Sequence, residues 1–177
     1  MKIICISGKA QHGKDTTAGI LREILEERGK KVLIAHFGDL VKFVAEKYFG
    51  WDGKKDERGR TLLQYVGTDR VRAQSPDYWV DFVVSMLTFF DGEWDYVLIP
   101  DCRFPNEYEI FVHNDFNVTL LRVERPGFDN GLTPEQKAHP SETALDNYGY
   151  HVQIINGGTM TQLRKAIQYA VEAGEIE

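Results

Sequence analysis

The sequence predicts an α/β protein in three layers, with a parallel five-stranded sheet covered by helices on both faces. Short apolar runs alternate with segments whose apolar residues recur at helical spacing, as in repeated β–α units. The first apolar run is followed by a glycine-containing loop that opens directly into a helix. Alternation of this kind places the carboxyl ends of all strands at one edge of the sheet, where ligands bind.

The first predicted strand is the apolar run at residues 3–6, and it leads into a loop bounded by Gly8 and Gly13. Apolar residues then recur at helical spacing, so a helix is predicted over residues 14–28. A strand, a glycine loop ending in Lys14 and a helix start form the context of a phosphate-binding loop. The fold predicted from this stretch is therefore the three-layer P-loop NTPase fold.

The chemistry of this loop follows from its backbone. Glycines let successive N–H groups turn inward toward an anion, and the helix start adds its own N–H groups and the positive end of its dipole. A lysine here reaches the β- and γ-phosphates of ATP. We expect the following loop residues to bind the nucleotide: Gly8, Ala10, Gln11, His12, Gly13, Lys14, Thr16 and Thr17. No catalytic role is assigned to the histidine.

One position departs from the usual phosphate-loop pattern. The residue after Lys14 is Asp15, where Ser or Thr usually ligates Mg²⁺. We therefore assign the Mg²⁺ role to the hydroxyl of Thr16, and count Asp15 among the catalytic candidates.

The remaining elements follow in order along the chain. Strands are predicted over residues 31–37, 95–100, 117–124 and 150–155. Helices are predicted from Gly38 to about Tyr48, over 61–73, from Asp77 to Leu87, and from Pro105, Thr133, Ser141 and Thr159 onward. Residues 50–59 are predicted to be a polar loop. The long segment at about 125–140 is either a lid that closes over the phosphates or a surface excursion.

Length and composition set the broad class. With 177 residues, 42% hydrophobic and 27% charged, the chain is predicted to be one ordinary globular domain over residues 1–177. The net charge of −6 argues against nucleic-acid binding, and no apolar run has membrane-spanning length. Cys5 and Cys102 suggest a reduced, cytoplasmic protein rather than a disulfide framework.

The residue that follows the third strand, Asp101, stands where a second nucleotide-binding carboxylate holds Mg²⁺ or its waters. A helix N-cap is the alternative role for this aspartate. The next residue is Cys102 rather than a water-activating acid, and the chain has no Asn-Lys-x-Asp segment for reading guanine. Both facts favour phosphoryl transfer over nucleotide hydrolysis.

Arginines near the strand ends are candidates for neutralising phosphate charge, since guanidinium binds phosphate oxygens in a bidentate fork. Arg103 is the first catalytic candidate and Arg125 the second. Arg122 and Asn156, at the ends of the fourth and fifth strands, are expected on the nucleotide side. Solvated surface charge is the alternative for any single arginine.

Motifs along nearly the whole chain resemble those of the bacteriophage deoxynucleoside monophosphate kinases. These motifs are Ser7-Gly8 with Gly13-Lys14-Asp15-Thr16-Thr17, His36-Phe37-Gly38-Asp39-Leu40-x-Lys42, Leu63-Gln64-x-x-Gly67-Thr68, Asp77-x-Trp79-Val80, Asp101-x-Arg103-Phe104-Pro105-Asn106-Glu107, and His139-Pro140-Ser141-Glu142. The family shares the unusual aspartate after the lysine. It usually has Phe-Ala-Asp-Pro-Leu-Lys in the second motif, where this chain has Phe-Gly-Asp-Leu-Val-Lys.

The resemblance implies a kinase that transfers the γ-phosphate of MgATP to a deoxynucleoside monophosphate in the cytoplasm, that of the host if the protein is phage-encoded. Its partners would be small nucleotides, and both a monomer and a homodimer stay open. The acceptor site would contain Asp39, Lys42, Thr68, Arg70, Arg72, Trp79, Arg103 and Glu142. Two alternatives stay open: a kinase for another phosphorylated acceptor, of the dephospho-coenzyme A or phosphomevalonate type, and a non-catalytic nucleotide-binding regulator.

Overall fold

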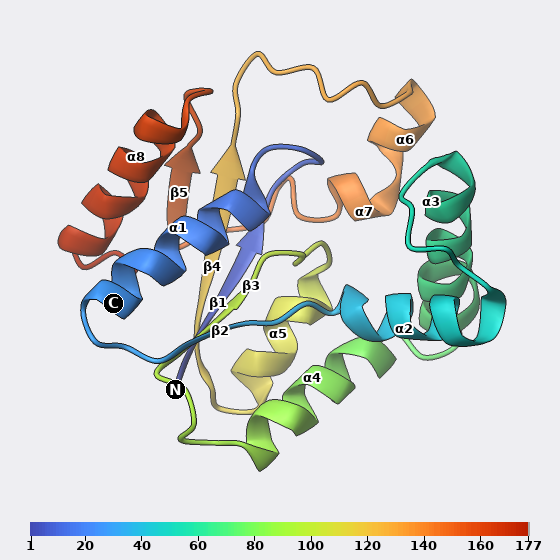
Figure 1. Ribbon diagram of the computed structural model, residues 1–177, viewed down its shortest axis with the longest axis horizontal. Coiled ribbons are helices and arrows are strands. Elements are labelled where there is room, and N and C mark those ends of the chain that lie inside the picture. Colours follow the sequence, from blue (N-terminus) through green and yellow to red (C-terminus); the bar gives the residue numbers. More distant parts are fainter. Residues whose placement is uncertain (177) are drawn as a thin grey trace. The chain divides into compact units, whose positions relative to one another are not determined.

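In the computed structural model, which describes residues 1–176, a parallel sheet forms the centre of one of the two units into which the chain divides (Figure 1). The first unit comprises Met1–Ala35 and Asp91–Glu177, and the second is His36–Phe90. The first unit carries the phosphate loop and every strand of the sheet. The second unit is helical.

The strands of the first unit are β1 Lys2–Ser7, β2 Val32–Ile34, β3 Tyr96–Ile99, β4 Asn117–Glu124 and β5 Val152–Ile155. Within the described residues their order is β2-β3-β1-β4-β5, and each neighbouring pair is parallel. The central strand β1 therefore lies between β3 and β4. The sheet is built outward from it in both directions, and a ligand crevice is expected at the carboxyl end of such a switch point.

This sheet confirms the predicted fold class, and the bounds of β4 agree with the prediction. Strand β2 is shorter than the predicted 31–37, because it is an edge strand that pairs only with β3. Just beyond the end of β2, the Ala35 N–H donates a hydrogen bond of 3.0 Å to the Leu98 carbonyl of β3. Strand β5 begins at Val152 rather than at residue 150.

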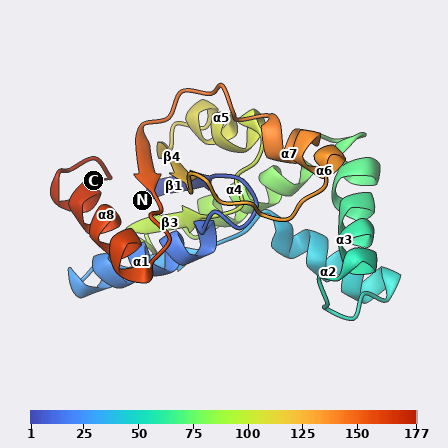
Figure 2. The same cartoon turned by 90° about the horizontal axis from the view of Figure 1, so that it is seen from above.

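The core of the first unit lies on both faces of the sheet. Helices α1 Lys14–Glu27 and α8 Met160–Glu172 cover one face, and α5 Pro105–His113 covers the other (Figure 2). Ile3, Ile4 and Ile6 are fully buried, as expected for a parallel strand with helices on both sides. This packing fixes the end of β1, and with it the start of the phosphate loop.

The second unit contains α2 Gly38–Phe49, α3 Glu57–Gln64, a π-helix at Tyr65–Arg72, and α4 Tyr78–Phe89. The predicted helix 61–73 is thus wrong at its start and in its type. Helix α3 begins four residues earlier because the Asp56 carboxylate caps it, accepting from the Gly59 N–H at 2.8 Å. Part of the predicted 50–59 loop is therefore helical.

Two short helices, α6 Pro134–Ala138 and α7 Pro140–Thr143, lie between β4 and β5 in the chain. The Thr133 capping box is confirmed, and so is the cap by Thr159 that opens α8.

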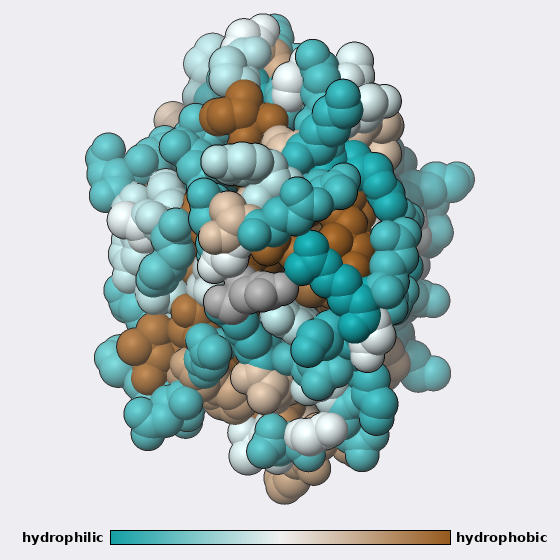
Figure 3. Space-filling view, turned by 90° about the vertical axis from the view of Figure 1, so that its left-hand side faces the viewer, coloured by the Kyte–Doolittle hydropathy of each residue, from teal (hydrophilic) through white to brown (hydrophobic). Residues whose placement is uncertain are grey.

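The face nearest α8 is mostly hydrophilic, with hydrophobic residues in separate small groups (Figure 3). Among the helices described, none is both long and apolar enough to cross a membrane.

Candidate active site

The loop between β1 and α1 has a conformation that requires glycine at both ends. A Cβ atom at Gly8 would stand 2.5 Å from the Val123 carbonyl oxygen, which is backbone and cannot move aside. Gly13, with φ of 100°, precedes the first residue of α1, and a Cβ there would stand 2.8 Å from Nδ2 of Asn156. Between them Gln11 adopts a left-handed φ of 62°. The backbone is thus curled as the sequence predicted for a phosphate loop.

Lys14 is folded back onto this loop. Its Nζ donates to the carbonyls of Gly8 at 2.7 Å and Lys9 at 2.9 Å, and the residue is only 7% exposed. Burial, with a smaller contribution from the nearby charge of Arg103, lowers the pKa of Lys14 to about 8, while Glu142 acts in the opposite direction. A buried ammonium with carbonyl partners is ready to transfer its hydrogen bonds to phosphate oxygens.

We expect nucleotide binding to become weaker as the pH rises through about 8. The pKa of Lys14 is about 8 in the ligand-free protein, and phosphate charge raises it in the complex. Above about pH 8 the complex therefore holds a proton that the ligand-free protein has lost. The affinity for ADP should fall by up to about tenfold per pH unit there.

Calorimetry of ADP binding between about pH 7 and pH 9, in two buffers of different ionisation enthalpy, measures both affinity and proton uptake. Lys14→Arg is the matched control, because arginine stays charged and its profile should be flat across this range. A wild-type affinity that is flat over the same range, with no proton uptake, would place Lys14 away from the phosphates.

Arg103 lies in the loop after β3, and its position is fixed through its backbone. The buried carboxylate of Glu107 accepts from the N–H groups of Arg103 at 2.6 Å and Phe104 at 3.0 Å. The guanidinium reaches toward the phosphate loop and donates from Nη1 to Oε1 of Glu142 at 3.0 Å. Arg103 and Lys14 are thus brought to one site, as predicted.

The segment that follows α6 supplies carboxylates to this site. Oε2 of Glu142, in α7, accepts from the Ala10 N–H of the phosphate loop at 2.8 Å. Asp146 accepts from Nζ of Lys9 at 2.5 Å and from Nη2 of Arg122 at 3.1 Å. The site therefore contains cations of the kind that bind phosphate, and the carboxylates of Glu142 and Asp146 pair with them.

Arg122 and Asn156, both predicted nucleotide ligands, donate hydrogen bonds to the phosphate loop and to the strand end before it. Arg122 is 6% exposed and donates from Nη1 to Oγ of Ser7 at 3.1 Å, while its guanidinium lies 5.4 Å from the Tyr150 ring. Asn156 donates from Nδ2 to the His12 carbonyl at 2.9 Å. These contacts stabilise the curled backbone, and direct contact with nucleotide stays a prediction for both residues.

The segment at 125–140 begins in contact with the phosphate loop. The Arg125 N–H donates to Nδ1 of His12 at 3.2 Å, and burial lowers the pKa of that imidazole, which favours the neutral, accepting form. The Arg125 guanidinium stacks over Phe128, 4.0 Å from the ring centroid. Asn130 donates from Nδ2 to the Ala10 carbonyl at 3.4 Å and accepts from Nε2 of Gln11.

The Mg²⁺ role of Thr16 and Asp101 stays a prediction, and their side-chain oxygens are of the type that Mg²⁺ takes. Thr16 and Asp101, the predicted ligands, are half-buried at the start of α1 and after β3. Within residues 1–176 there is no group of three or more His, Cys, Asp or Glu side chains that could hold a metal ion by itself. Mg²⁺ commonly takes one or two protein oxygens and completes its shell with substrate phosphates and water. Thr17 in the same turn is fully buried, and its hydroxyl has no hydrogen-bond partner among the described residues.

Comparison with known proteins decides the family. A model of the deoxynucleotide monophosphate kinase family matches residues 41–167, well over half of the 177 residues. The chain belongs to the deoxynucleotide monophosphate kinase family. The matched range begins after the phosphate loop, so the loop geometry and the family match are separate observations.

Two curated relatives share 30% identity with this family member. The deoxynucleotide monophosphate kinase of Enterobacteria phage T4 aligns over 111 residues, which are 62% of this chain and 43% of that protein. The ORF77 protein of Ictalurid herpesvirus 1 (strain Auburn) aligns over 158 residues, 89% of this chain and 64% of that protein. The chain therefore spans less than two thirds of the length of either relative.

Solved structures agree on the fold of this deoxynucleotide monophosphate kinase family member. Mycobacterium tuberculosis APS kinase CysC, in complex with AMPPNP and APS, superposes with a TM-score of 0.53 at 10% identity, covering 97% of both chains. The APE1195 structure gives 0.50 at 12% identity, covering 98% of this chain and 96% of that one. At such low identity the likeness shows the fold alone, and it confirms the predicted P-loop fold.

The remaining acceptor-site residues predicted from the family all lie in the second unit. Asp39 pairs with Lys42, its predicted neighbour, at 2.7 Å on one face of α2. Thr68, Arg70 and Arg72 lie on the π-helix, a conformation frequent at functional sites. Trp79 is 3% exposed, and its indole N–H donates to the Gly67 carbonyl at 2.9 Å, so it ties α4 to the π-helix. Their contact with an acceptor stays a prediction.

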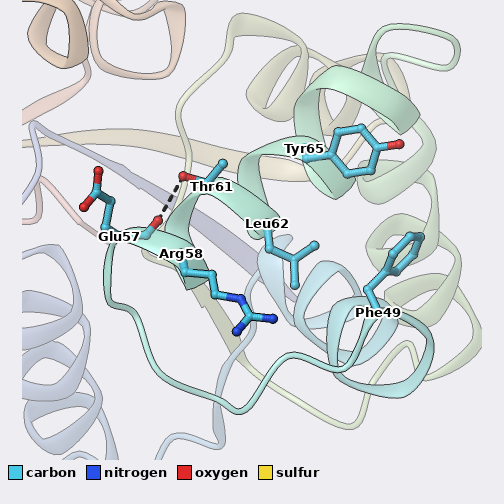
Figure 4. A pocket seen from close by; sticks show the side chains of 6 residues that line it. All are labelled: Phe49, Glu57, Arg58, Thr61, Leu62 and Tyr65. Carbon is cyan, nitrogen blue, oxygen red and sulfur yellow. Dashed lines mark hydrogen bonds between the residues drawn. The ribbon is translucent and has the colours of Figure 1, made fainter.

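A separate cavity of about 520 Å³ lies in the second unit (Figure 4). Apolar and charged side chains from the end of α2, from α3 and from the start of the π-helix line it: Phe49, Glu57, Arg58, Thr61, Leu62 and Tyr65. Two of these residues are joined within α3 by a hydrogen bond of 2.9 Å from the Thr61 hydroxyl to the Glu57 carbonyl. None of the predicted site residues lines this cavity.

Sequence reasoning missed three residues that shape the phosphate site: Lys9, Glu107 and Asp146. Glu107 had a local signal, because Pro105 and Glu107 stand at the first and third positions of α5, where an acid bonds the N–H groups before the helix. Lys9 and Asp146 meet across 137 residues of chain. Nothing in the local sequence around either residue indicates that contact.

Proposed function

We propose that this protein transfers the γ-phosphoryl group of ATP to a deoxynucleoside monophosphate. The observation that carries the proposal is membership of the deoxynucleotide monophosphate kinase family in a chain whose phosphate loop is complete. The curled backbone from Gly8 to Gly13 and the ammonium of Lys14 support a nucleotide triphosphate donor. Arg103, held beside the loop, supports transfer rather than simple binding.

The acceptor phosphate needs little activation. Its second pKa is about 6, so it is already a nucleophilic anion at neutral pH. One of its oxygens attacks the γ-phosphorus, the bond from that phosphorus to the β–γ bridging oxygen breaks, and ADP leaves with the electron pair. The products are ADP and the deoxynucleoside diphosphate. The task left to the protein is to position the two phosphates and neutralise them.

Each residue of the site has a part in that task. The loop N–H groups hold the donor phosphates, and Lys14 exchanges its carbonyl partners for phosphate oxygens. Arg103 stabilises the charge that spreads over the transferring group. Thr16 and Asp101 would hold Mg²⁺, which supplies further charge neutralisation when bound.

The test is ADP formation from MgATP in the presence of dTMP, dGMP or dCMP, one at a time, beside a reaction without acceptor. We expect ADP only when an acceptor is present, with a matching deoxynucleoside diphosphate. Equal ADP without acceptor would instead indicate an ATPase. No ADP, despite measurable ATP binding, would favour the dephospho-coenzyme A or phosphomevalonate type of acceptor, or the regulatory alternative.

A further inference from the structure

The carboxylate of Glu142 lies where a phosphate would bind. Oε2 accepts from the Ala10 N–H of the phosphate loop at 2.8 Å, and Oε1 accepts from the Arg103 guanidinium at 3.0 Å. The Glu142 side chain is only 7% exposed, while the Arg103 side chain is 38% exposed. A loop N–H and a guanidinium are the donors that phosphate oxygens take in a P-loop site.

The same segment also contacts two further cations near the loop, Lys9 and Arg122. The Glu142 carbonyl accepts from Nζ of Lys9 at 2.6 Å, and Asp146 bridges Lys9 and Arg122. The Tyr150 hydroxyl donates to the Leu145 carbonyl in the same segment. Residues 140–146 therefore form a strap over the phosphate loop, beside which α7 is seen in Figure 1.

Because of these contacts, the Glu142 carboxylate and a bound phosphate would compete for the same hydrogen-bond donors. A carboxylate and a phosphate cannot both accept from the Ala10 N–H and the Arg103 guanidinium, and two anions at one buried position repel each other. A nucleotide phosphate must therefore displace the Glu142 carboxylate before it reaches both donors. Breaking the two hydrogen bonds of the Glu142 carboxylate costs free energy, and this cost makes nucleotide binding weaker.

We propose that Glu142 is an internal competitor of the nucleotide, whose carboxylate occupies the phosphate loop of the empty protein and is displaced when phosphate binds. Its role in the site is thus to keep the Arg103 guanidinium paired and directed at the loop until phosphate arrives. The inference rests on the proposed function only in that the displacing ligand is the phosphate chain of a nucleotide.

The first test measures binding of inorganic tripolyphosphate and of ADP to wild-type protein and to Glu142→Gln by calorimetry. Glutamine keeps the size of the side chain but removes its charge, so it competes less well. We expect both ligands to bind the variant about tenfold more tightly, which equals about 1.4 kcal/mol. Damage to a merely structural residue would weaken binding rather than strengthen it.

Glu23→Gln is the matched control. Glu23 is an exposed acid on α1 that pairs with Arg164 at 2.6 Å, and its loss should leave the affinity unchanged. If Glu142→Gln binds tripolyphosphate as wild type does, or more weakly, while Glu23→Gln is unchanged, the inference is overturned. The measurement needs no turnover, so a protein with no kinase activity can still show the tighter binding, and an active kinase can fail to show it.

A second measurement uses the unaltered protein, in case the variant does not fold. With ¹³C-labelled glutamate, the side-chain carboxyl resonance of Glu142 should shift when tripolyphosphate is added, as its hydrogen bonds are replaced by water. The Glu23 resonance should stay in place. A Glu142 resonance that does not move while tripolyphosphate binds would show that the carboxylate is not displaced.

Discussion

Lys14→Ala is expected to remove nearly all phosphoryl transfer while leaving the protein folded. The Lys14 ammonium lies on the loop carbonyls of Gly8 and Lys9, directly at the phosphate site. In the proposed function it is the charge that meets the β- and γ-phosphates, so its loss should lower kcat/KM by about 10³-fold, in the range seen for preorganised charged groups. Acceptor-dependent ADP formation measures the loss.

Stability should respond differently from activity. Burial lowers the pKa of Lys14, which means that the folded protein disfavours the charged ammonium at neutral pH. Removing it should therefore change the melting temperature by less than about 4 °C. Lys30→Ala, at an exposed lysine after α1, is the control and should change neither quantity. A steep fall in melting temperature with transfer activity spared would make Lys14 a structural residue and the loop assignment wrong.

Local sequence patterns predicted the order and type of the elements of the first unit, although not the bounds of β2 and β5, because these elements obey one rule. Each strand is a short apolar run between turn residues, and each helix has an apolar face at helical spacing, so β4 at 117–124 and α1 from Lys14 could be predicted almost to the residue. In the second unit the same rule predicts α2 and α4 closely, but it fails for the segment between them. Residues 65–72 form a π-helix in which Val66 and Gly67 are buried, and the sequence of this segment has no distinct period that would indicate it.

The candidate site divides in the same way. The phosphate loop is contiguous, and the roles of Gly8, Gly13 and Lys14 follow from their spacing alone. The contact of Glu142 with Ala10 joins residues 132 apart in the chain, and the strap exists only because β4 and β5 bring that segment back to the loop. Glu142 was predicted as an acceptor ligand from the family motif. Its contact with the donor loop could not be predicted, because the sequence does not give the path of the chain after β4.

Arg103→Ala is expected to lower kcat by about 10²- to 10³-fold while changing the KM for ATP only a few-fold. The guanidinium is placed beside the phosphate loop by the Glu107 carboxylate, which fixes the backbone of Arg103, and it pairs with Glu142. Its charge matters most when negative charge spreads over the transferring phosphoryl group, so its loss should affect the transition state more than the bound ATP. Steady-state kinetics with varied ATP and saturating acceptor separate the two effects.

Arg22→Ala provides the comparison, since Arg22 is an α1 arginine with only a long, exposed ion pair to Glu26 at 3.9 Å. A loss confined to ATP binding in Arg103→Ala would reassign Arg103 to the donor phosphates of the ground state.

The proposed competition by Glu142 adds a further consequence. Without Arg103, the Glu142 carboxylate keeps the Ala10 N–H as its hydrogen-bond donor, so it competes less with phosphate. Glu142→Gln should then tighten tripolyphosphate binding less in the Arg103→Ala background than in the wild type, because the two substitutions act on the same ion pair.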